Sequence, residues 1–329
     1  MQRKIAVIMG SDSDFETMRV MIPVFQDNGI DYEFRVLSAH RTPVIATEFA
    51  RNAKSEGYDL IIAGAGMSAH LPGVLAAFTG VPVIGVPIKS EASGMDGMDA
   101  LHSIIQMPPG IPVATVGIDN APGAAKLAVK MINCFRKTEN DHARPIVKII
   151  HNQSEVSEAN LKKATDILDI YGISHIVADL TGIVPSGIAG PDTPALDAAY
   201  TGQVTDALNA CESDSTFAFL NLTGIDIEKI TTSDACAREI PLIEVPLKAA
   251  SNEFNQTSDK IYYQTGRAES AAFVGVNSFQ NAAHLIARIA GIHDAAKYDG
   301  VIDEHANLAA AVIEKDARIR GEINAGKLK

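Results

Sequence analysis

The stretch IMGSDSDFETM, residues 8–18, decides how the start of the chain folds. The apolar segment Lys4–Met9 is typical of a buried strand, and it leads into the small polar turn Gly10–Asp14. A helix is predicted from about Phe15, and its first turn presents free backbone N–H groups beside the short hydroxyls of the polar turn. A phosphate suits this arrangement, because the N–H groups and the helix dipole both favour an anion.

The composition is that of a globular protein with enough residues for two domains. The 329 residues are 47% hydrophobic and 21% charged, with a formal net charge of −12. That charge argues against a general nucleic-acid or membrane-surface binder, because both need clustered Lys and Arg. Cys134, Cys211 and Cys236 are odd in number and widely spaced, so we interpret them as reduced thiols of a cytoplasmic protein. We expect no signal peptide and no transmembrane helix.

Strands and helices are predicted to alternate through the first half of the chain, which favours an α/β fold. The predicted strands are so apolar that we expect a parallel sheet covered by helices on both faces. Ligands of such sheets bind at the carboxyl ends of the strands, so the polar turns that follow three of them should converge on one crevice. The predicted strands are 4–9, 31–37, 60–63, 81–87 and 113–118, and the predicted helices are 15–28, 43–56, 71–78, 93–106 and 121–135.

The second half of the sequence resembles a degenerate copy of the first. PIVKIIHNQSE (145–155) matches the start of the chain, and IPLIEVPLK (240–248) matches VPVIGVPIK (81–89). AFVGVNSFQNAAHLIARI (272–289) then matches ATVGIDNAPGAAKLAVKM (114–131), so three segments recur in the same order. The alternative is that any α/β domain produces strands and helices of this composition.

The copies suggest where the domains begin and end. We predict a first domain over 1–135, a linker over the polar stretch 136–145, a second domain over 146–290 and a helical tail over 291–329. In the tail, Leu308–Arg320 has apolar residues at helical spacing. A helix of that length is marginal alone, so we expect it to dock on a neighbouring subunit or domain.

The first polar turn, GSDSD, allows two interpretations. Gly10 permits close approach of a ligand to the backbone, and Ser11 and Ser13 can donate hydroxyl hydrogen bonds to it. Asp14 could accept from ribose hydroxyls or cap the following helix. Simple N-capping explains the same residues equally well.

The second polar turn, SAHRTP (38–43), combines three functional side chains at a predicted strand end. Arg41 can form a bidentate pair with a phosphate, and Ser38 lies beside it. His40 suits proton transfer, because the unperturbed pKa of histidine lies near neutrality. The alternative is a surface histidine and arginine at the edge of the sheet.

The third polar turn, GAGMSAHLPG (64–73), places two glycines directly after a buried strand. Such a thin loop can wrap a planar ligand with backbone groups. His70 precedes Leu71, where a helix can begin, and it is either a ligand contact or a loop histidine satisfied by its surroundings.

Several cofactor motifs are missing from the sequence. It contains no P-loop for ATP, no dinucleotide-binding glycine fingerprint at the first turn and no nucleophile elbow. It also contains no convincing cluster of metal ligands. We therefore expect a reaction that uses no ATP, NAD or metal cofactor.

Together, these motifs make residues 1 to about 135 resemble the PurE family of purine biosynthesis. GSDSD, SAHRTP, AHLPG, the VPxxGVP strand with Lys89-Ser90, MDALHSIIQMPPGIPVATV (98–116) and NAPGAAKLA (120–128) all occur in the family's order. The combination SAHRTP with AHLPG resembles the branch of N5-carboxyaminoimidazole ribonucleotide mutases. Met67-Ser68 and Pro109 depart from the residues common in the family.

The resemblance implies two tandem flavodoxin-like three-layer domains with parallel sheets and a helical tail. It implies a carboxyl shift from N5 to C4 of an aminoimidazole ribonucleotide, with His40 as general acid/base and His70 walling a CO2 pocket. Ser11, Ser38 and Arg41 would hold the 5′-phosphate, and Asp14 the ribose. Further substrate contacts would come from Gly10, Ser13, Ala39, Ala65, Gly66 and Leu71.

Two other functions remain open. One is a CO2-dependent aminoimidazole ribonucleotide carboxylase that uses the same pocket. The other is a non-catalytic nucleotide-binding scaffold. Single-domain members of the family assemble as octamers, so a fused pair is expected to form a homotetramer that mimics the octamer.

The second copy lacks the functional residues of the first. HNQSE replaces GSDSD, Ile183 falls about where His40 should be, and TGIDIEKITT (223–232) replaces the histidine-containing loop. We therefore predict a catalytically silent pseudo-domain. A regulatory site built on His151, Asn152 and Glu155 is the less favoured alternative.

Overall fold

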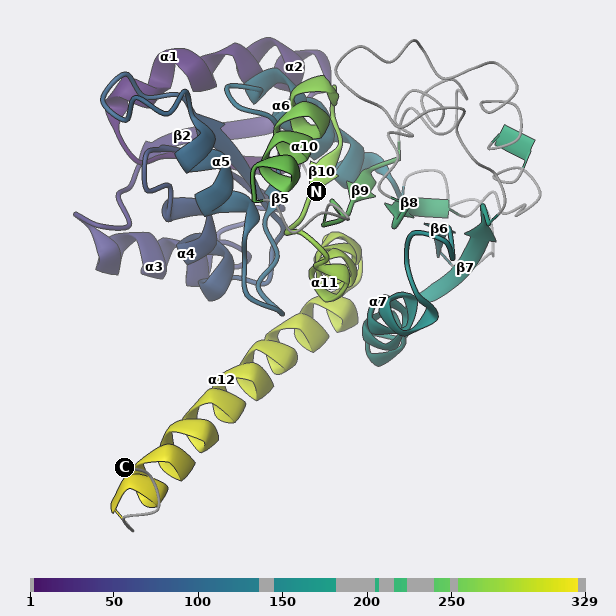
Figure 1. The fold of residues 1–329 in the computed structure, drawn as a ribbon. Helices are drawn as coiled ribbons and strands as arrows, with labels where there is room; N and C mark the ends of the chain where they lie inside the picture. The colour runs from purple at the N-terminus through teal and green to yellow at the C-terminus, as the bar shows by residue number, and fades with distance from the viewer. Residues whose placement is uncertain are drawn as a thin grey trace.

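The computed structural model describes residues 3–135, 145–181, 205–206, 216–223, 240–248 and 254–324. These residues form one ten-stranded sheet with the strand order β2-β1-β3-β4-β5-β10-β9-β8-β6-β7 (Figure 1). Neighbouring strands pair in parallel except β5 and β10, which are antiparallel. The predicted α/β fold class is confirmed.

The first half of the chain builds one side of this sheet in the order 2-1-3-4-5, which is that of flavodoxin-like folds. Strands such as β3 and β4 are buried on both faces, because helices cover each of them. Helices α1, α2 and α6 pack on one face and α3, α4 and α5 on the other. The elements are β1 (Lys4–Met9), η1 (Asp12–Asp14), α1 (Phe15–Met18), η2 (Arg19–Met21), α2 (Ile22–Asp27), β2 (Asp31–Val36), α3 (Pro43–Asn52), β3 (Leu60–Gly66), α4 (Leu71–Phe78), β4 (Val83–Ile88), α5 (Met98–Ile105), β5 (Ala114–Thr115) and α6 (Ala121–Asn133).

The second half repeats the strand order of the first, with β7-β6-β8-β9-β10 in the places of β2-β1-β3-β4-β5. The last matched segments keep a constant spacing of 158 residues, since β5 and β10 begin at 114 and 272 and α6 and α11 at 121 and 279. Asp119 and Asn277, also 158 residues apart, both have a positive φ, of 56° and 53°. The elements are β6 (Ile146–His151), α7 (Glu158–Ile170), β7 (Ser174–Asp179), β8 (Thr216–Asn221), β9 (Leu242–Glu244), α10 (Phe254–Arg267), β10 (Ala272–Phe273), α11 (Phe279–Ala290) and α12 (Ala295–Asn324).

The two halves share one sheet, whereas the sequence led us to expect two separate sheets. They join where Phe273 of β10 pairs with Thr115 of β5. Each of these short strands would otherwise be a sheet edge with unpaired backbone groups. Apolar side chains of both halves then cover the seam, among them Ile105 of α5 and Ile261 of α10.

Two predicted helices differ from the observed ones for local reasons. The predicted helix 15–28 is split by the 3₁₀ turn η2, just before Pro23, which has no N–H to donate within a helix. The predicted helix 93–106 begins only at Met98, because Gly94 and Gly97 have φ values of 64° and 86°. The predicted linker lies outside the described residues except for Pro145.

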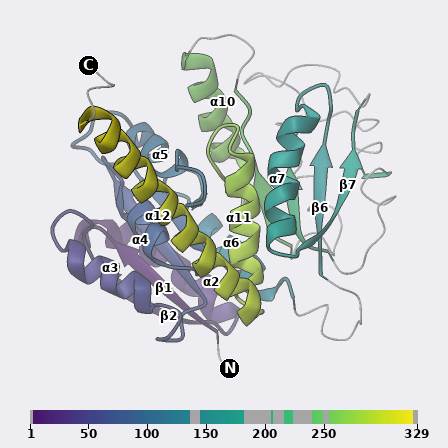
Figure 2. The same cartoon turned by 90° about the horizontal axis from the view of Figure 1, so that it is seen from below.

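Helix α11 lies in the middle of the molecule, between α7 of the second half and the helices of the first half (Figure 2). Its Arg288 is 1% exposed and donates hydrogen bonds to Ala76 O (3.0 Å) and to His305 Nε2 (2.6 Å). Burial lowers the pKa of His305 to about 4 and that of Arg288 to about 10. At neutral pH the arginine is therefore charged, and the neutral histidine can accept its hydrogen bond.

Helix α12 spans 30 residues and contains the predicted helical segment Leu308–Arg320. Its beginning packs on the first half, since Tyr298 and Ile302 lie against Gly80. Its later part projects from the body (Figure 1) and exposes Val312 and Ile313 by 64% and 69%. The docking of this tail on another subunit and the homotetramer remain predictions. None of the helices in the described parts of the chain is long and apolar enough to cross a membrane.

Candidate active site

The three polar turns meet at one edge of the sheet, as the sequence predicts. The register aligns their strands, because Met9 pairs with Val36 on one side and with Gly64 on the other. Arg41 of the second turn donates from Nη2 to Gly10 O of the first turn at 3.0 Å. Gly10 also lies against Leu71 of the third turn, so one residue contacts both of the other turns.

The first turn is ordered by its own hydrogen bonds. Ser11 Oγ accepts from Ser13 N, and the Asp14 carboxylate accepts from Ser11 N at 3.1 Å, which forms a capping box at the start of η1. Ser13 Oγ donates to Ser11 Oγ at 2.9 Å. Burial raises the pKa of Asp14 above its usual range, although these hydrogen bonds oppose the shift. In the structure, Ser11 and Asp14 therefore cap the start of η1.

The second turn presents His40 and Arg41 to solvent. Ser38 Oγ accepts from Arg41 N at 3.1 Å, and Thr42 Oγ1 accepts from Ser38 N at 2.9 Å. These bonds close the turn immediately before α3, whose first residue is Pro43. Ala39 packs underneath, against the apolar core on this face of the sheet.

The third turn brings its histidine to the second turn. His70 stands at the N-cap position of α4, and its Nδ1 lies 2.9 Å from His40 Nε2. The two rings meet edge to face, with centroids 5.1 Å apart. One proton serves this contact, so one ring donates while the other accepts. A pair of exposed imidazoles joined in this way can pass a proton to a ligand in the crevice and take it back.

The remaining residues of the third turn form its thin wall. Strand β3 continues through Ala65 and Gly66, three residues further than predicted. Met67 then adopts a left-handed conformation with φ of 55° and leaves its side chain 48% exposed. Turn bonds from Ala69 N to Met67 O and from His70 N to Ser68 O lead into α4. All the predicted site residues therefore lie at this edge of the sheet.

Lys89, Ser90 and Asp119 are not among the site residues predicted from the sequence, yet they lie at the same edge of the sheet. Ser90 lies beside Gly66, and Lys89 N donates to Asp119 Oδ1 at 3.0 Å. Lys89 Nζ is 2.7 Å from Asp96 Oδ1. The sequence could have indicated two of them, because Lys89 and Ser90 directly follow the apolar strand β4, just as the three polar turns follow β1 to β3.

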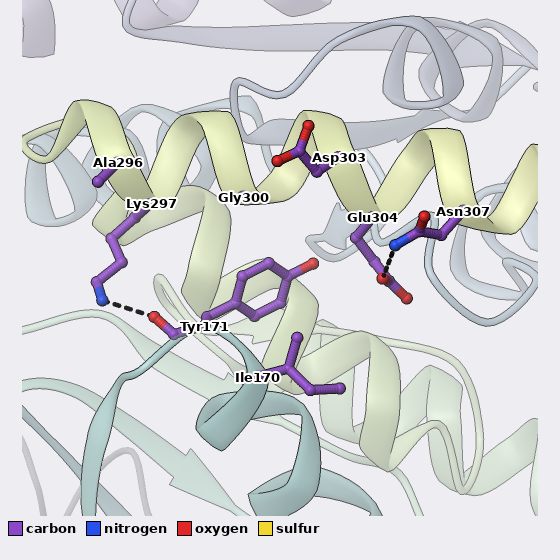
Figure 3. Close-up of a pocket in the computed structure, with 8 residues that line it drawn as sticks. All are labelled: Ile170, Tyr171, Ala296, Lys297, Gly300, Asp303, Glu304 and Asn307. Atoms are coloured by element: carbon purple, nitrogen blue, oxygen red, sulfur yellow. Dashed lines mark hydrogen bonds between the residues drawn. The ribbon is translucent and has the colours of Figure 1, made fainter.

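A separate pocket lies between the end of α7 and α12, away from the polar turns (Figure 3). Lys297 Nζ is engaged there with Tyr171 O at 2.6 Å and Gly172 O at 3.1 Å. Glu304 accepts from Asn307 Nδ2 at 3.2 Å. The two Lys297 bonds join α12 to the end of α7, whereas the Glu304–Asn307 bond lies within α12. Among the described residues, no three His, Cys, Asp or Glu side chains are grouped as a metal site would require.

The corresponding edge of the second half carries different side chains. His151 is buried and its Nε2 donates to Val156 O at 2.7 Å, while Asn152 Oδ1 accepts from Ser154 N and Oγ. Ile183, the counterpart of His40, and residues 224–232 of the replaced loop lie outside the described residues.

Comparisons with known proteins identify the family. The family model described as AIR carboxylase matches residues 4–155, which include all three polar turns. N5-carboxyaminoimidazole ribonucleotide mutase of Pyrococcus abyssi is 58% identical over 130 residues, or 40% of this chain and 74% of the relative. Phosphoribosylaminoimidazole carboxylase of Saccharomyces cerevisiae is 50% identical over 131 residues, or 40% of this chain and 23% of that protein. The crystal structure of Treponema denticola PurE has a sequence 28% identical to this chain. The match covers 41% of this chain and 82% of the Treponema chain, with a TM-score of 0.36. This chain therefore belongs to the AIR carboxylase, or PurE, family.

Proposed function

We propose that the chain is an N5-carboxyaminoimidazole ribonucleotide mutase of purine biosynthesis. Its substrate would carry a carboxylate on N5 of an aminoimidazole ribonucleotide, and its product would carry that carboxylate on C4. The observation that carries the proposal is the contact between His40 and His70 at the edge where the three turns meet. The Pyrococcus abyssi mutase, which matches at 58% identity, supports the same activity.

The proposed reaction needs one proton to move from C4 of the ring to N5, the exocyclic amino nitrogen. The N5–carboxyl bond breaks, its electron pair stays on N5, and CO2 is released as N5 takes a proton. The enamine-like C4 then attacks the trapped CO2, and the C4 proton leaves to a base. His40 would supply the first proton and accept the second, so no proton is gained or lost overall. Holding CO2 beside C4 makes the recombination effectively unimolecular.

The surrounding residues would bind the nucleotide. The Arg41 guanidinium has five N–H donors, of which one bonds to Gly10 O, so the others can hold the 5′-phosphate together with the Ser11 and Ser38 hydroxyls. Asp14 would accept from the ribose hydroxyls. The thin wall of Ala65 and Gly66, with Ser13, Ala39, His70 and Leu71 around it, would enclose the base and the CO2.

The second half would be a catalytically silent pseudo-domain derived by duplication. Its repeated strand order and the constant spacing from β5 and α6 to β10 and α11 support this origin. The domains would span 1–135 and 146–290, joined by a linker over 136–145 and followed by the tail 291–329.

A CO2-dependent aminoimidazole ribonucleotide carboxylase is the second candidate, because the Saccharomyces cerevisiae relative bears that kind of name at 50% identity. Labelled bicarbonate separates the two. We expect the chain to convert unlabelled N5-carboxyaminoimidazole ribonucleotide in ¹³C-bicarbonate buffer to a product whose carboxyl carbon stays unlabelled. Mass spectrometry of the product gives the answer, and full incorporation of ¹³C during early turnover would favour the carboxylase instead.

A further inference from the structure

Helix α11 of the second half reaches into the first half with a buried amide. Asn281 is 0% exposed, and its side chain makes three hydrogen bonds to the turn 107–110. Its Oδ1 accepts from Gly110 N at 2.8 Å, and its Nδ2 donates to Met107 O at 3.1 Å and to Pro108 O at 3.0 Å. A buried amide with all these bonds made fixes the backbone of the turn, because no water can replace them.

The turn held by Asn281 is in contact with the first turn of helix α4, whose N-cap residue is His70. A Cβ added at Gly73, in the first turn of α4, would lie 2.9 Å from Met107 Sδ and 3.1 Å from its Cε, so the two are in tight contact. Gly73 is three residues after His70, and Val74 N donates to His70 O at 2.9 Å. The position of the turn therefore sets the position of the start of α4.

The same helix also holds the other end of α4. Arg288, two turns after Asn281 on α11, donates to Ala76 O in the last turn of α4. Helix α11 is thus linked to both ends of α4. Asn281 is linked to its start through the turn 107–110, and Arg288 is bonded directly to its last turn. His70 stands at the N-cap of this short helix, and its contact with His40 depends on where the helix lies.

The first half makes an amide contact with the second half from a different position. Asn120, at the start of α6, donates from Nδ2 to Ala268 O at 3.2 Å, so the two halves touch each other through equivalent helix starts. The counterpart of Asn281 in the matched segments is Gly123, where a Cβ would lie 2.4 Å from Glu269 O. A side chain fits at this position only on the second half, which is the half without the predicted catalytic histidines.

We propose that Asn281 and Arg288 are positioning residues through which the second half places His70 against His40. The proposal rests on the proposed function, because the carboxyl shift is the reaction that the histidine pair would serve. It gives the second half a role in turnover, although the sequence predicts no catalytic side chain there. A displacement of His70 by about 1 Å is enough to lower a rate by about 100-fold.

The test compares Asn281→Ala with Leu168→Ala in the full chain. Leu168 is buried in α7, in an apolar cluster separate from the one that holds α4 and Met107, so its truncation lowers stability without removing a contact to the turn or to α4. At a temperature where both variants are fully folded, we expect Asn281→Ala to lose about 10- to 100-fold in kcat with little change in KM. We expect Leu168→Ala to keep the kcat of the intact chain. Equal kcat values in the two variants would overturn the proposal.

Met107→Ala is the second variant. It removes the side chain that contacts Gly73 of α4, and it leaves the hydrogen bonds of the buried Asn281 amide in place. Its kcat should also fall while its melting temperature changes little. Arg288→Lys should retain more activity than Arg288→Ala, since a lysine can still donate to Ala76 O. If Met107→Ala has the full kcat, or if the two Arg288 variants are equal, the link to α4 is wrong.

A measurement that does not depend on catalysis tests the positioning role separately from the proposed mutase activity. The ¹⁵N resonances of the His40 and His70 rings report their mutual hydrogen bond whatever reaction the chain performs. Asn281→Ala should shift both resonances, and Leu168→Ala should leave them in place. An intact chain that lacks mutase activity but shows these shifts would contradict the function alone, whereas unchanged resonances in Asn281→Ala would contradict the positioning role.

Discussion

Replacing His40 with asparagine should lower kcat for the carboxyl shift by about 10²- to 10⁴-fold, the usual contribution of general acid–base catalysis. Asparagine can still form a hydrogen bond at this place, but it can neither accept the C4 proton nor give a proton to N5. The loss should therefore fall on kcat, with a smaller change in KM, and steady-state kinetics on N5-carboxyaminoimidazole ribonucleotide measures both. The exposed position of His40 makes a large change in the free energy of unfolding unexpected, with a limit of about 0.5 kcal/mol.

His175→Asn is the matched control for this variant. His175 lies on β7 in the second half, and its Nδ1 is near Ile173 O rather than any polar turn of the candidate site. It should keep the full kcat of the intact chain. A His40→Asn variant that turns over as fast as this control would show that the acid/base is another residue.

Replacing Arg41 with alanine should raise KM by about 10- to 150-fold, because hydrogen bonds to charged groups contribute about 1.5–3 kcal/mol each. The guanidinium also donates to Gly10 O, so its loss removes a hydrogen bond between the first and second turns. Arg41→Lys should recover part of the affinity as a point charge, without the bidentate geometry. Binding of the substrate and of inorganic phosphate by calorimetry measures the effect apart from turnover.

The control for Arg41 is Arg51→Ala, a change near the end of helix α3, which follows the turn that carries Arg41. The Arg51 guanidinium lies over the Phe78 ring, 4.5 Å from its centroid, on the protein's own surface. It should leave KM unchanged. If Arg41→Ala binds phosphate and substrate as tightly as Arg51→Ala, the phosphate lies elsewhere in the crevice.

Sequence patterns located the site because they follow from strand geometry. Polar turns after apolar strands had to meet at one edge once the strands were parallel, and all the predicted residues lie there. The patterns did not predict the contact between His40 and His70. The two residues are 30 positions apart in the sequence, and a sequence pattern does not determine the relative orientation of two exposed rings. Nor did they show that Asp14 caps the turn at Ser11, which was only one of two interpretations.

The joining of the halves could not be predicted from local sequence. The pairing of Thr115 with Phe273 connects strands of two residues each, which are too short to leave a periodic pattern. Helix α11 is buried on nearly every side, although it carries Asn281, His284 and Arg288. A polar residue at such a position normally indicates an exposed face. These three are buried because each has a partner elsewhere in the fold: the turn 107–110 for Asn281, Ala76 O and His305 for Arg288, and the Tyr171 hydroxyl for His284.

The mutase activity itself can be measured by incubating the intact chain with N5-carboxyaminoimidazole ribonucleotide, without ATP, and quantifying the C4-carboxylated product. We expect catalytic formation of that product, fast enough to exceed the spontaneous loss of CO2 from the substrate. Decay of the substrate to free aminoimidazole ribonucleotide and CO2, at the rate seen without protein, would contradict it.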